Sequence, residues 1–422
     1  QEVMGRITIT SRMLFVSTLI FFSGIHHLEA KTIKYEKVQL DIAQTEIPFE
    51  ELLDIGIMLF DPNVPKKEDP MIFPEIRKAE ARYMPYHLKK TLESTGHWSG
   101  VWVLPERSKA IDLIIVGRIE KSDGLDVELK IGVWDIVGAQ WINKTYKSNI
   151  AGSSYSKRRD LTQDPYQNIF NKIANDLLQI KQAKAREDLI RLSQTGEIRF
   201  ASELIPVYDE YISKNKKNIY SLERLPSEDD EIMQRILEVQ EREFLLLDTL
   251  NEYYGQLYEN LSQPYEDWRK LSREDMITYE ELQRSARTRK ILGAVALAGA
   301  LATDGDSRAS STMRQMAIYG GIEGLRSGFA TASEAKIYQE SLKESGADFD
   351  AQAKPLVIEL EGQTIRLTGG WVSMLHSIFN SNLLMSKIKI LNKATLLPSK
   401  QDQSLLDVNL FNIKNNERTN SI

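Results

Sequence analysis

Two segments in the second half of the chain consist mainly of alanine and glycine, and they limit how the helices around them can pack. The first reads ILGAVALAGALA (291–302) and the second reads GGIEGLRSG (320–328). At helical spacing each segment gathers small residues on one face, which lets two helix backbones approach closely. These residues are Ala294, Ala298 and Ala302 in the first segment and Gly320, Gly324, Gly328 and Ala332 in the second. Because a glycine inside a helix costs about 1 kcal/mol relative to alanine, we expect close packing to offset these glycines.

The polar link 303–311 between the two segments is long enough to reverse the chain. The sequence therefore predicts a helical hairpin over 291–332, packed within one chain or between subunits. An alternative is that this hairpin inserts into a bilayer. The first segment is shorter than the roughly 20 apolar residues of a membrane-spanning helix. The second carries Glu323 and Arg326, and charged side chains are costly in lipid. Packing in water is therefore the preferred prediction.

Residues 186–350 are predicted to form a helical domain. Within it, 231–290 is dense in helix formers and is interrupted only at Pro264. Large apolar and aromatic residues recur along this stretch at helical spacing, at Leu237, Phe244, Leu247, Leu250, Tyr254, Leu257, Tyr258 and Leu261. Such a tyrosine-rich stripe is either a binding platform or the seam between two long helices, and we interpret it as a seam. The following KPLVIELEGQTIRLTG (354–369) alternates apolar and polar residues, which predicts a small β-hairpin within 351–369.

The first half of the chain is typical of an α+β domain over 31–185. Its expected elements, in chain order, are a strand in 52–62, a helix from Pro74 to a cap at Gly96, a strand at 100–106, a three-strand meander over 110–150 and a helix at 165–183. In the meander, apolar and charged residues alternate, so one sheet face is buried and the other is solvated. The predicted fold class is α+β: an amino-terminal α/β sandwich with a mostly antiparallel meander sheet, followed by a long-helix α domain and a small β-hairpin.

Three runs in this domain carry a family resemblance: DIGIMLFDP, RYMPYHLKKTLESTGHWSGVWVLP and IDLIIVGRIEKSDGLDVELKIGVWDIVGAQ. The last has an Asp before a buried strand and ends in an Asp-x-x-Gly turn. Residues 52–185 thus resemble the small α/β domain shared by the amino-terminal part of TolB, the curli-secretion protein CsgG and the penicillin-binding-protein activator LpoB. The resemblance implies a docking or assembly module of the bacterial envelope. Many relatives are lipid-anchored through a cysteine that is absent here, and the lack of a repeat of about 40 residues excludes a TolB-like propeller.

The two ends of the sequence differ from the rest. Residues 1–30 have Arg6 and Arg12, an apolar core over 14–25 and a small residue at Ala30. This layout is typical of a secretory signal peptide, with an uncleaved membrane anchor as the alternative, and it predicts an exported, periplasmic protein. The tail 370–422 is rich in Asn, Ser and Lys and net positive, and is predicted to be atypical and disordered.

Few residues in the sequence are suited to catalysis or metal binding. The net charge of −6 gives no basic surface for nucleic acid, and the chain contains 5 histidines and no cysteine. Only His87 and His97 fall in the expected folded part, so neither a zinc site nor any other metal or cofactor site is predicted. A carboxylate pair such as Asp54 and Asp61 leaves a hydrolase as a remote alternative.

The sequence therefore predicts a non-catalytic, exported cell-envelope protein that acts as a protein-docking or assembly module. Its α/β domain would bind an envelope protein, and its helical part would mediate tight helix packing or oligomerisation of the coiled-coil kind. Peripheral contact with a membrane is a further expectation. The alternative function is a membrane-associated protein that inserts the hairpin 291–332 into a bilayer.

Overall fold

A computed structural model describes residues 37–67, 72–155, 164–302 and 308–380 of the chain. The predicted signal peptide (1–30) and most of the predicted disordered tail (370–422) lie outside these residues. The chain divides into a compact unit that ends at Glu361 and a second unit, of which the structure describes only 362–380. The architecture is α+β, with a mixed sheet, two very long helices and a small two-stranded hairpin, so the predicted fold class is confirmed.

The sheet has five strands in the order β2-β1-β3-β4-β5. These are β1 (Ile55–Met58), β2 (Val101–Leu104), β3 (Leu113–Ser122), β4 (Asp126–Asp135) and β5 (Gln140–Asn149). β1 runs parallel to both of its neighbours, and β3, β4 and β5 form the predicted antiparallel meander. Its two turns contain Gly124 (φ 79°) and Gly138 (φ 101°), backbone angles that side chains disfavour. The meander prediction is therefore confirmed.

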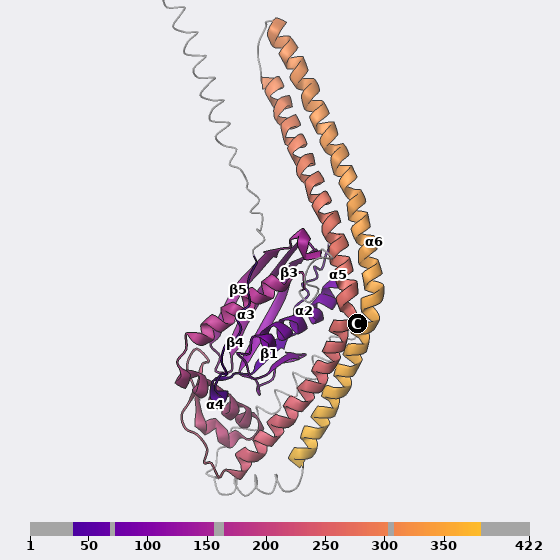
Figure 1. Ribbon diagram of the computed structural model, residues 1–422. Helices are drawn as coiled ribbons and strands as arrows, with labels where there is room; N and C mark the ends of the chain where they lie inside the picture. Colours follow the sequence, from indigo (N-terminus) through magenta and orange to yellow (C-terminus); the bar gives the residue numbers. More distant parts are fainter. Residues whose placement is uncertain (1–36, 68–71, 156–163, 303–307, 381–422) are drawn as a thin grey trace, which may run out of the picture. The chain divides into compact units, whose positions relative to one another are not determined.

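Two helices pack side by side on one face of this sheet, α2 (Pro74–Ser94) and α3 (Gln167–Gln182) (Figure 1). Proline suits the first turn of α2 because its missing N–H has no partner there in any helix. The chain leaves α2 through Gly96, which adopts the left-handed φ of 69°. α3 buries Ile169, Ile173 and Leu177 completely. Both helices follow the predicted bounds closely.

A short connecting region follows α3. It consists of α4 (Arg186–Leu204), the 3-10 helix η3 (Pro206–Tyr211) and a two-stranded hairpin of β6 (Ile212–Lys214) and β7 (Tyr220–Leu222). The fold thus contains a small hairpin, but it lies before the long helices and not after them as the sequence predicts.

Two helices make up the remainder of the described chain, α5 (Glu231–Ala302) and α6 (Arg308–Asn380). The predicted interruption at Pro264 is wrong, because α5 runs through it; the buried Leu261 and Tyr265 on either side offset the lost backbone bond. The β-hairpin predicted within 351–369 is also wrong, because this segment belongs to α6. The buried residues of α6 in and just before this segment recur at helical spacing, at Phe349, Ala353, Val357 and Leu360.

Candidate functional site

The tyrosine stripe of α5 faces the α/β part of the molecule. Tyr258 stacks on Tyr83 of α2 with ring centroids 4.5 Å apart, and Tyr265 meets the same ring edge-on at 4.9 Å. On its other side Tyr265 lies 5.9 Å from the ring of Phe349 in α6. The stripe is therefore a packing seam, and its main partner is α2, with α6 contacting its carboxy-terminal end.

A buried ion pair between Asp164 and Arg269 lies at this seam. We call these two residues, together with Glu80, the polar junction. Arg269 Nη1 and Nη2 donate to the two carboxylate oxygens of Asp164 at 2.8 Å and 2.9 Å. Its guanidinium lies 4.0 Å from the centroid of the Tyr265 ring. Burial alone would raise the pKa of Asp164, but the charge and hydrogen bonds of Arg269 outweigh it and hold this pKa well below its usual range. The junction thus carries a fixed, paired charge.

Glu80 on α2 completes the junction. Its Oε1 accepts hydrogen bonds from Ser122 of β3 and, at 2.6 Å, from the Tyr265 hydroxyl. Burial raises the pKa of Glu80 above its usual value, and the nearby Arg77 charge opposes this effect. Through Glu80, Asp164 and their partners, α5 is bonded to α2, to β3 and to the segment before α3. Breaking the junction would leave charged groups buried without partners, so it fixes α5 on the α/β part.

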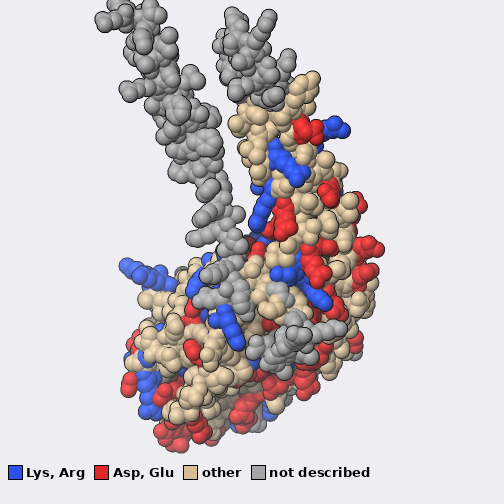
Figure 2. All heavy atoms as spheres, turned by 45° about the horizontal axis from the view of Figure 1, so that its top comes forward, with Lys and Arg blue, Asp and Glu red and all other residues tan. Residues whose placement is uncertain are grey.

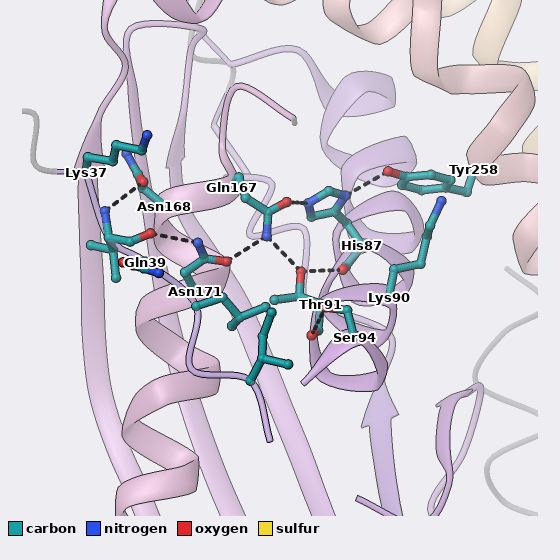
Figure 3. A pocket seen from close by; sticks show the side chains of 13 residues that line it. Lys37, Gln39, His87, Lys90, Thr91, Ser94, Gln167, Asn168, Asn171 and Tyr258 are labelled. Carbon is teal, nitrogen blue, oxygen red and sulfur yellow. Dashed lines mark hydrogen bonds between the residues drawn. The ribbon is translucent and has the colours of Figure 1, made fainter. Parts of the chain in front are cut away.

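His87, the first histidine considered in the sequence, lies between Gln167 and Tyr258 (Figure 3). Gln167 Nε2 donates to Thr91 at 3.1 Å and to Asn171 at 2.8 Å, so its Oε1 is the acceptor for His87 Nε2 at 2.8 Å. His87 Nδ1 is then the acceptor for the Tyr258 hydroxyl at 2.7 Å. Burial lowers the pKa of His87, which keeps the ring neutral. Both nitrogens are engaged in holding α2, α3 and α5 together.

His87 also borders an open cavity of about 780 Å³, and the described residues that line it include no carboxylate. His97, the second histidine, is only partly buried; burial and then the charge of Lys181 lower its pKa. Among the described residues that line this cavity, His87 therefore has no carboxylate beside it, and His97 is not one of them.

Carboxylates gather instead in a second cavity of about 470 Å³, lined by Asp54, Asp112 and Glu197 among others. Asp112 accepts a hydrogen bond from the Asp54 backbone N–H at 2.9 Å, and Asp54 accepts one from Gly100 N–H at 3.0 Å. Burial raises the pKa of Asp112 to about 7 and also raises those of Asp54 and Glu197. These acids thus hold the chain at the start of the central strands.

Asp54 and Asp61 lie beyond opposite ends of β1, and Asp61 is exposed and paired with Arg118 at 3.6 Å. They do not form the carboxylate pair considered from the sequence. Asp112 is the Asp that precedes the buried strand in the family resemblance, but the sequence analysis did not consider it as a candidate acid. Among the described residues, no group of three or more His, Asp or Glu side chains is arranged to hold a metal ion.

The small residues of α5 and α6 meet backbone to backbone. A Cβ added to Gly293 would lie 2.7 Å from Gly321 O, and one added to Gly324 would lie 3.0 Å from Gly293 Cα. A Cβ on Gly328 would lie 2.9 Å from Ala286 O. Such distances leave no room for a side chain. We call these four glycines, at positions 293, 321, 324 and 328, the glycine contact.

The predicted packing residues have different places in this arrangement. Gly324 and Gly328 belong to the glycine contact, and Ala332 is half-buried. A Cβ on Gly320 meets no described atom within 4 Å, and Ala294 and Ala298 are exposed. The side chain of Ala302 lies outside the described residues. Sequence reasoning missed Gly293 and Gly321, because the regular alanine spacing indicated a helix face one residue away from the contact.

Polar side chains accompany the glycine contact. Arg289 Nη1 donates to Ser327 and to Thr331, both at 2.9 Å. Further along the pair, Ser341 donates to Asp275 at 2.7 Å. Besides the contact between backbones, these hydrogen bonds therefore join α5 to α6.

Large apolar side chains point outward from the same helices. On α5 these are Ile291, Leu292 and Val295, and on α6 they are Tyr319, Ile322, Phe329 and Ile337, each more than half exposed. We call these seven residues the apolar surface. Figure 2 shows uncharged areas on the helical part, with both basic and acidic side chains between them. Among the described residues, no helix is both long enough and apolar enough to cross a membrane.

Comparison with known proteins finds no family model that matches the chain and no curated protein that matches it. The resemblance of residues 52–185 to envelope docking domains therefore stays a prediction. The function of the chain is therefore inferred from its own geometry, in which a helix pair is fixed to an α/β part and apolar side chains face outward.

Proposed function

We propose that this chain is a non-catalytic docking and assembly module of the bacterial cell envelope, exported to the periplasm. In this proposal the α/β part anchors the two long helices, and their apolar surface binds other protein chains. The observation that carries the proposal is the outward position of the seven apolar side chains. Exposed apolar patches on soluble proteins commonly mark interaction sites.

The glycine contact explains why these side chains are available for a partner. Because the two backbones touch directly, Ile291, Leu292 and Val295 are not used to hold α5 against α6. Burying an isoleucine, leucine or phenylalanine side chain completely contributes about 1.5–3 kcal/mol. Several such residues on one partner therefore supply enough free energy for a specific association.

The polar junction supports the same function. A docking surface needs a rigid support, and the bidentate Asp164–Arg269 pair fixes α5 where it crosses α2. The non-catalytic assignment is supported by His87, whose nitrogens are both engaged, and by Asp112, whose carboxylate binds a backbone amide.

The test compares two double substitutions of exposed apolar residues on α5. Ile291→Glu with Val295→Glu alters the apolar surface, whereas Leu245→Glu with Leu271→Glu alters exposed leucines elsewhere on the same helix. Light scattering after size exclusion should show that only the first variant loses self-association or capture of envelope proteins. Equal behaviour of the two variants, with unchanged helicity, would remove the basis of the proposal.

A second candidate function is peripheral contact with a lipid surface, favoured by the exposed Arg284 and Arg287 close to Ile291 on α5. The measurement is sedimentation with vesicles of phosphatidylglycerol. Binding that is lost in the Ile291→Glu, Val295→Glu variant, together with self-association that is unaffected, would favour lipid over protein as the partner.

A further inference from the structure

Three asparagines on one face of α3 hold a separate, extended piece of the chain. Asn168 Oδ1 accepts from Val38 N–H at 3.1 Å, and Asn171 Nδ2 donates to Val38 O at 2.8 Å. Asn175 does both, since it donates to Gln39 O at 2.8 Å and accepts from Asp41 N–H at 3.0 Å. Residues 38–41 are thus bound as a neighbouring β-strand would bind them, but by side-chain amides. Figure 3 shows the first two of these asparagines beside the segment.

The segment continues along α2. The backbone N–H of Ala43 donates to Thr95 O at 2.8 Å, at the end of that helix. Residues 38–43 therefore cross the space between α3 and the end of α2, and we call this space the asparagine groove. Val38, Leu40 and Ile42 also line the 780 Å³ cavity next to His87.

Recognition in the asparagine groove is directed at the backbone. Every hydrogen bond described above uses a main-chain group of the segment, while the side chains of Gln39, Asp41 and Ile42 are exposed. The molecule uses the same chemistry once more: Asn251 of α5 accepts from Val103 N–H at 2.8 Å and donates to Val103 O at 3.1 Å, at the edge strand β2. There the asparagine amide pairs with the main chain of an edge strand of the sheet. In the asparagine groove the amides of three asparagines bind a segment that does not belong to any strand or helix.

The free energy that holds the segment in its groove is modest. A hydrogen bond exchanged with water contributes a net free energy similar to the cost of ordering one residue. The five bonds along residues 38–43 therefore offset most of the cost of ordering six residues, and the partly buried Val38, Leu40 and Ala43 add a modest net attraction. The following residues 44–48, all of them described, form neither helix nor strand before η1 (Phe49–Glu51). They can serve as the hinge about which the segment swings out.

We propose that the asparagine groove is a docking site for an extended polypeptide, and that residues 38–43 of a second copy of this chain occupy it when two chains exchange these segments. The second copy is the occupant that fits without any change, because its identical segment restores the same five hydrogen bonds. Exchange of an identical element costs little for this reason. The proposal goes beyond the proposed function, since it concerns a different surface from the apolar surface of α5 and α6.

The absence of cysteine from the chain makes a disulfide test unambiguous. A Cβ added to Gly96 would lie 3.5 Å from Ala43 Cβ, which suits a disulfide. Ala43→Cys and Gly96→Cys chains carrying different tags are mixed and oxidised. Exchange predicts a mixed covalent dimer at least fivefold more abundant than from the control mixture of Ala43→Cys with Thr145→Cys, which places a cysteine on exposed β5.

The double variant Ala43→Cys, Gly96→Cys in one chain reports whether the segment lies in its own groove. If it closes internally while the mixture stays at the control level, the segment binds only its own chain and the exchange is refuted. If neither cross-link forms, the groove itself is refuted. Repeating the mixture in the Ile291→Glu, Val295→Glu background separates this result from the proposed function, because exchange should persist there.

A readout without cysteine guards against the strain of a side chain at Gly96, whose φ is positive. A fluorescent peptide of residues 37–44 should bind the full chain, as measured by anisotropy. Asn168→Ala with Asn175→Ala should weaken this binding about tenfold or more, as expected for three lost hydrogen bonds. Asn143→Ala, an exposed asparagine on β5, is the matched control and should have no effect. Equal binding by both variants would overturn the role of the asparagines.

Discussion

Helix α5 makes two close contacts by opposite means. At the polar junction it contributes large side chains, Tyr265 and Arg269, whose charge and hydroxyl are matched by Asp164 and Glu80. At the glycine contact it contributes almost nothing but backbone, because Gly293 touches Gly321 and Gly324 directly. The first contact is specific because few arrangements satisfy a buried charge. The second is specific because few helix faces are free of side chains.

The two contacts should therefore respond differently to substitution. Truncating a side chain should damage the polar junction, since it leaves partners buried and unpaired. Adding a side chain should damage the glycine contact, since no space is left for it. The predictions below test this contrast, from the largest expected effect to the smallest.

Replacing Arg269 by methionine should have the largest effect. The substitution keeps most of the volume but leaves the Asp164 carboxylate buried without its partner, which costs about 3–5 kcal/mol. Arg284→Met is the matched control, because Arg284 forms an exposed pair with Glu280 at 2.9 Å, and it should cost about 1 kcal/mol or less. Urea unfolding followed by tryptophan fluorescence measures both. A loss for Arg269→Met no larger than the control would show that the junction does not fix α5.

The second prediction contrasts Asp164, which has a countercharge, with Asp112, which lies among other carboxylates. Burial raises the folded-state pKa of Asp112 to about 7, above its value in the unfolded chain. The contribution of protonated Asp112 to stability is therefore complete below the pKa of this group in the unfolded chain. It is lost as the pH rises toward and through about 7. Burial likewise raises the pKa of Asp54 and of Glu197, which adds to the same trend.

Asp112→Asn keeps the oxygen that accepts the Asp54 N–H but cannot ionise. We expect the wild-type chain to lose about 2 kcal/mol between pH 5 and 8 through this group, and the variant to lose much less. The measurement is the urea midpoint at four pH values across this range. Asp164 should not contribute to the slope, because its lowered pKa keeps it ionised throughout. Parallel slopes for wild type and variant would contradict the assignment.

The contrast between the two contacts of α5 also helps to explain which parts of the structure could be predicted from the sequence. The meander and both sheet-covering helices were predictable, because strand alternation, Pro74 and Gly96 are local signals. The polar junction was not, since Glu80, Asp164 and Arg269 are far apart in sequence and look like surface charges. The error at 354–369 has a related cause. Ile358 and Leu360 alternate with glutamates as in a strand, whereas Val357 and Leu360 are spaced as on one face of a helix, and only the burial of Val357 and the exposure of Ile358 separate the two patterns.

The helix face of the hairpin was difficult to assign for a similar reason. Alanine and glycine alternate so densely in 291–302 and 320–328 that neighbouring faces are almost equally small. Regular spacing indicated Gly320, whereas the contact uses Gly321. The asparagine groove could not be predicted from a sequence pattern. Three asparagines on a helix are ordinary surface residues, and only the fold shows that an extended segment lies beside them.

The sharpest test of the glycine contact comes from placing leucine at two glycines of one helix, and the smallest effect expected is at the second of them. At Gly324 a side chain would be forced against Gly293, whose Cα lies 3.0 Å from the added Cβ, so Gly324→Leu should cost about 1–3 kcal/mol. At Gly320 the space is open, and Gly320→Leu should stabilise α6 by up to about 1 kcal/mol because the helical cost of glycine is removed. Thermal unfolding followed by circular dichroism should therefore shift in opposite directions for the same substitution one helical turn apart. Shifts of the same sign would mean that the two helices do not touch at Gly293, and the apolar surface would lose its explanation.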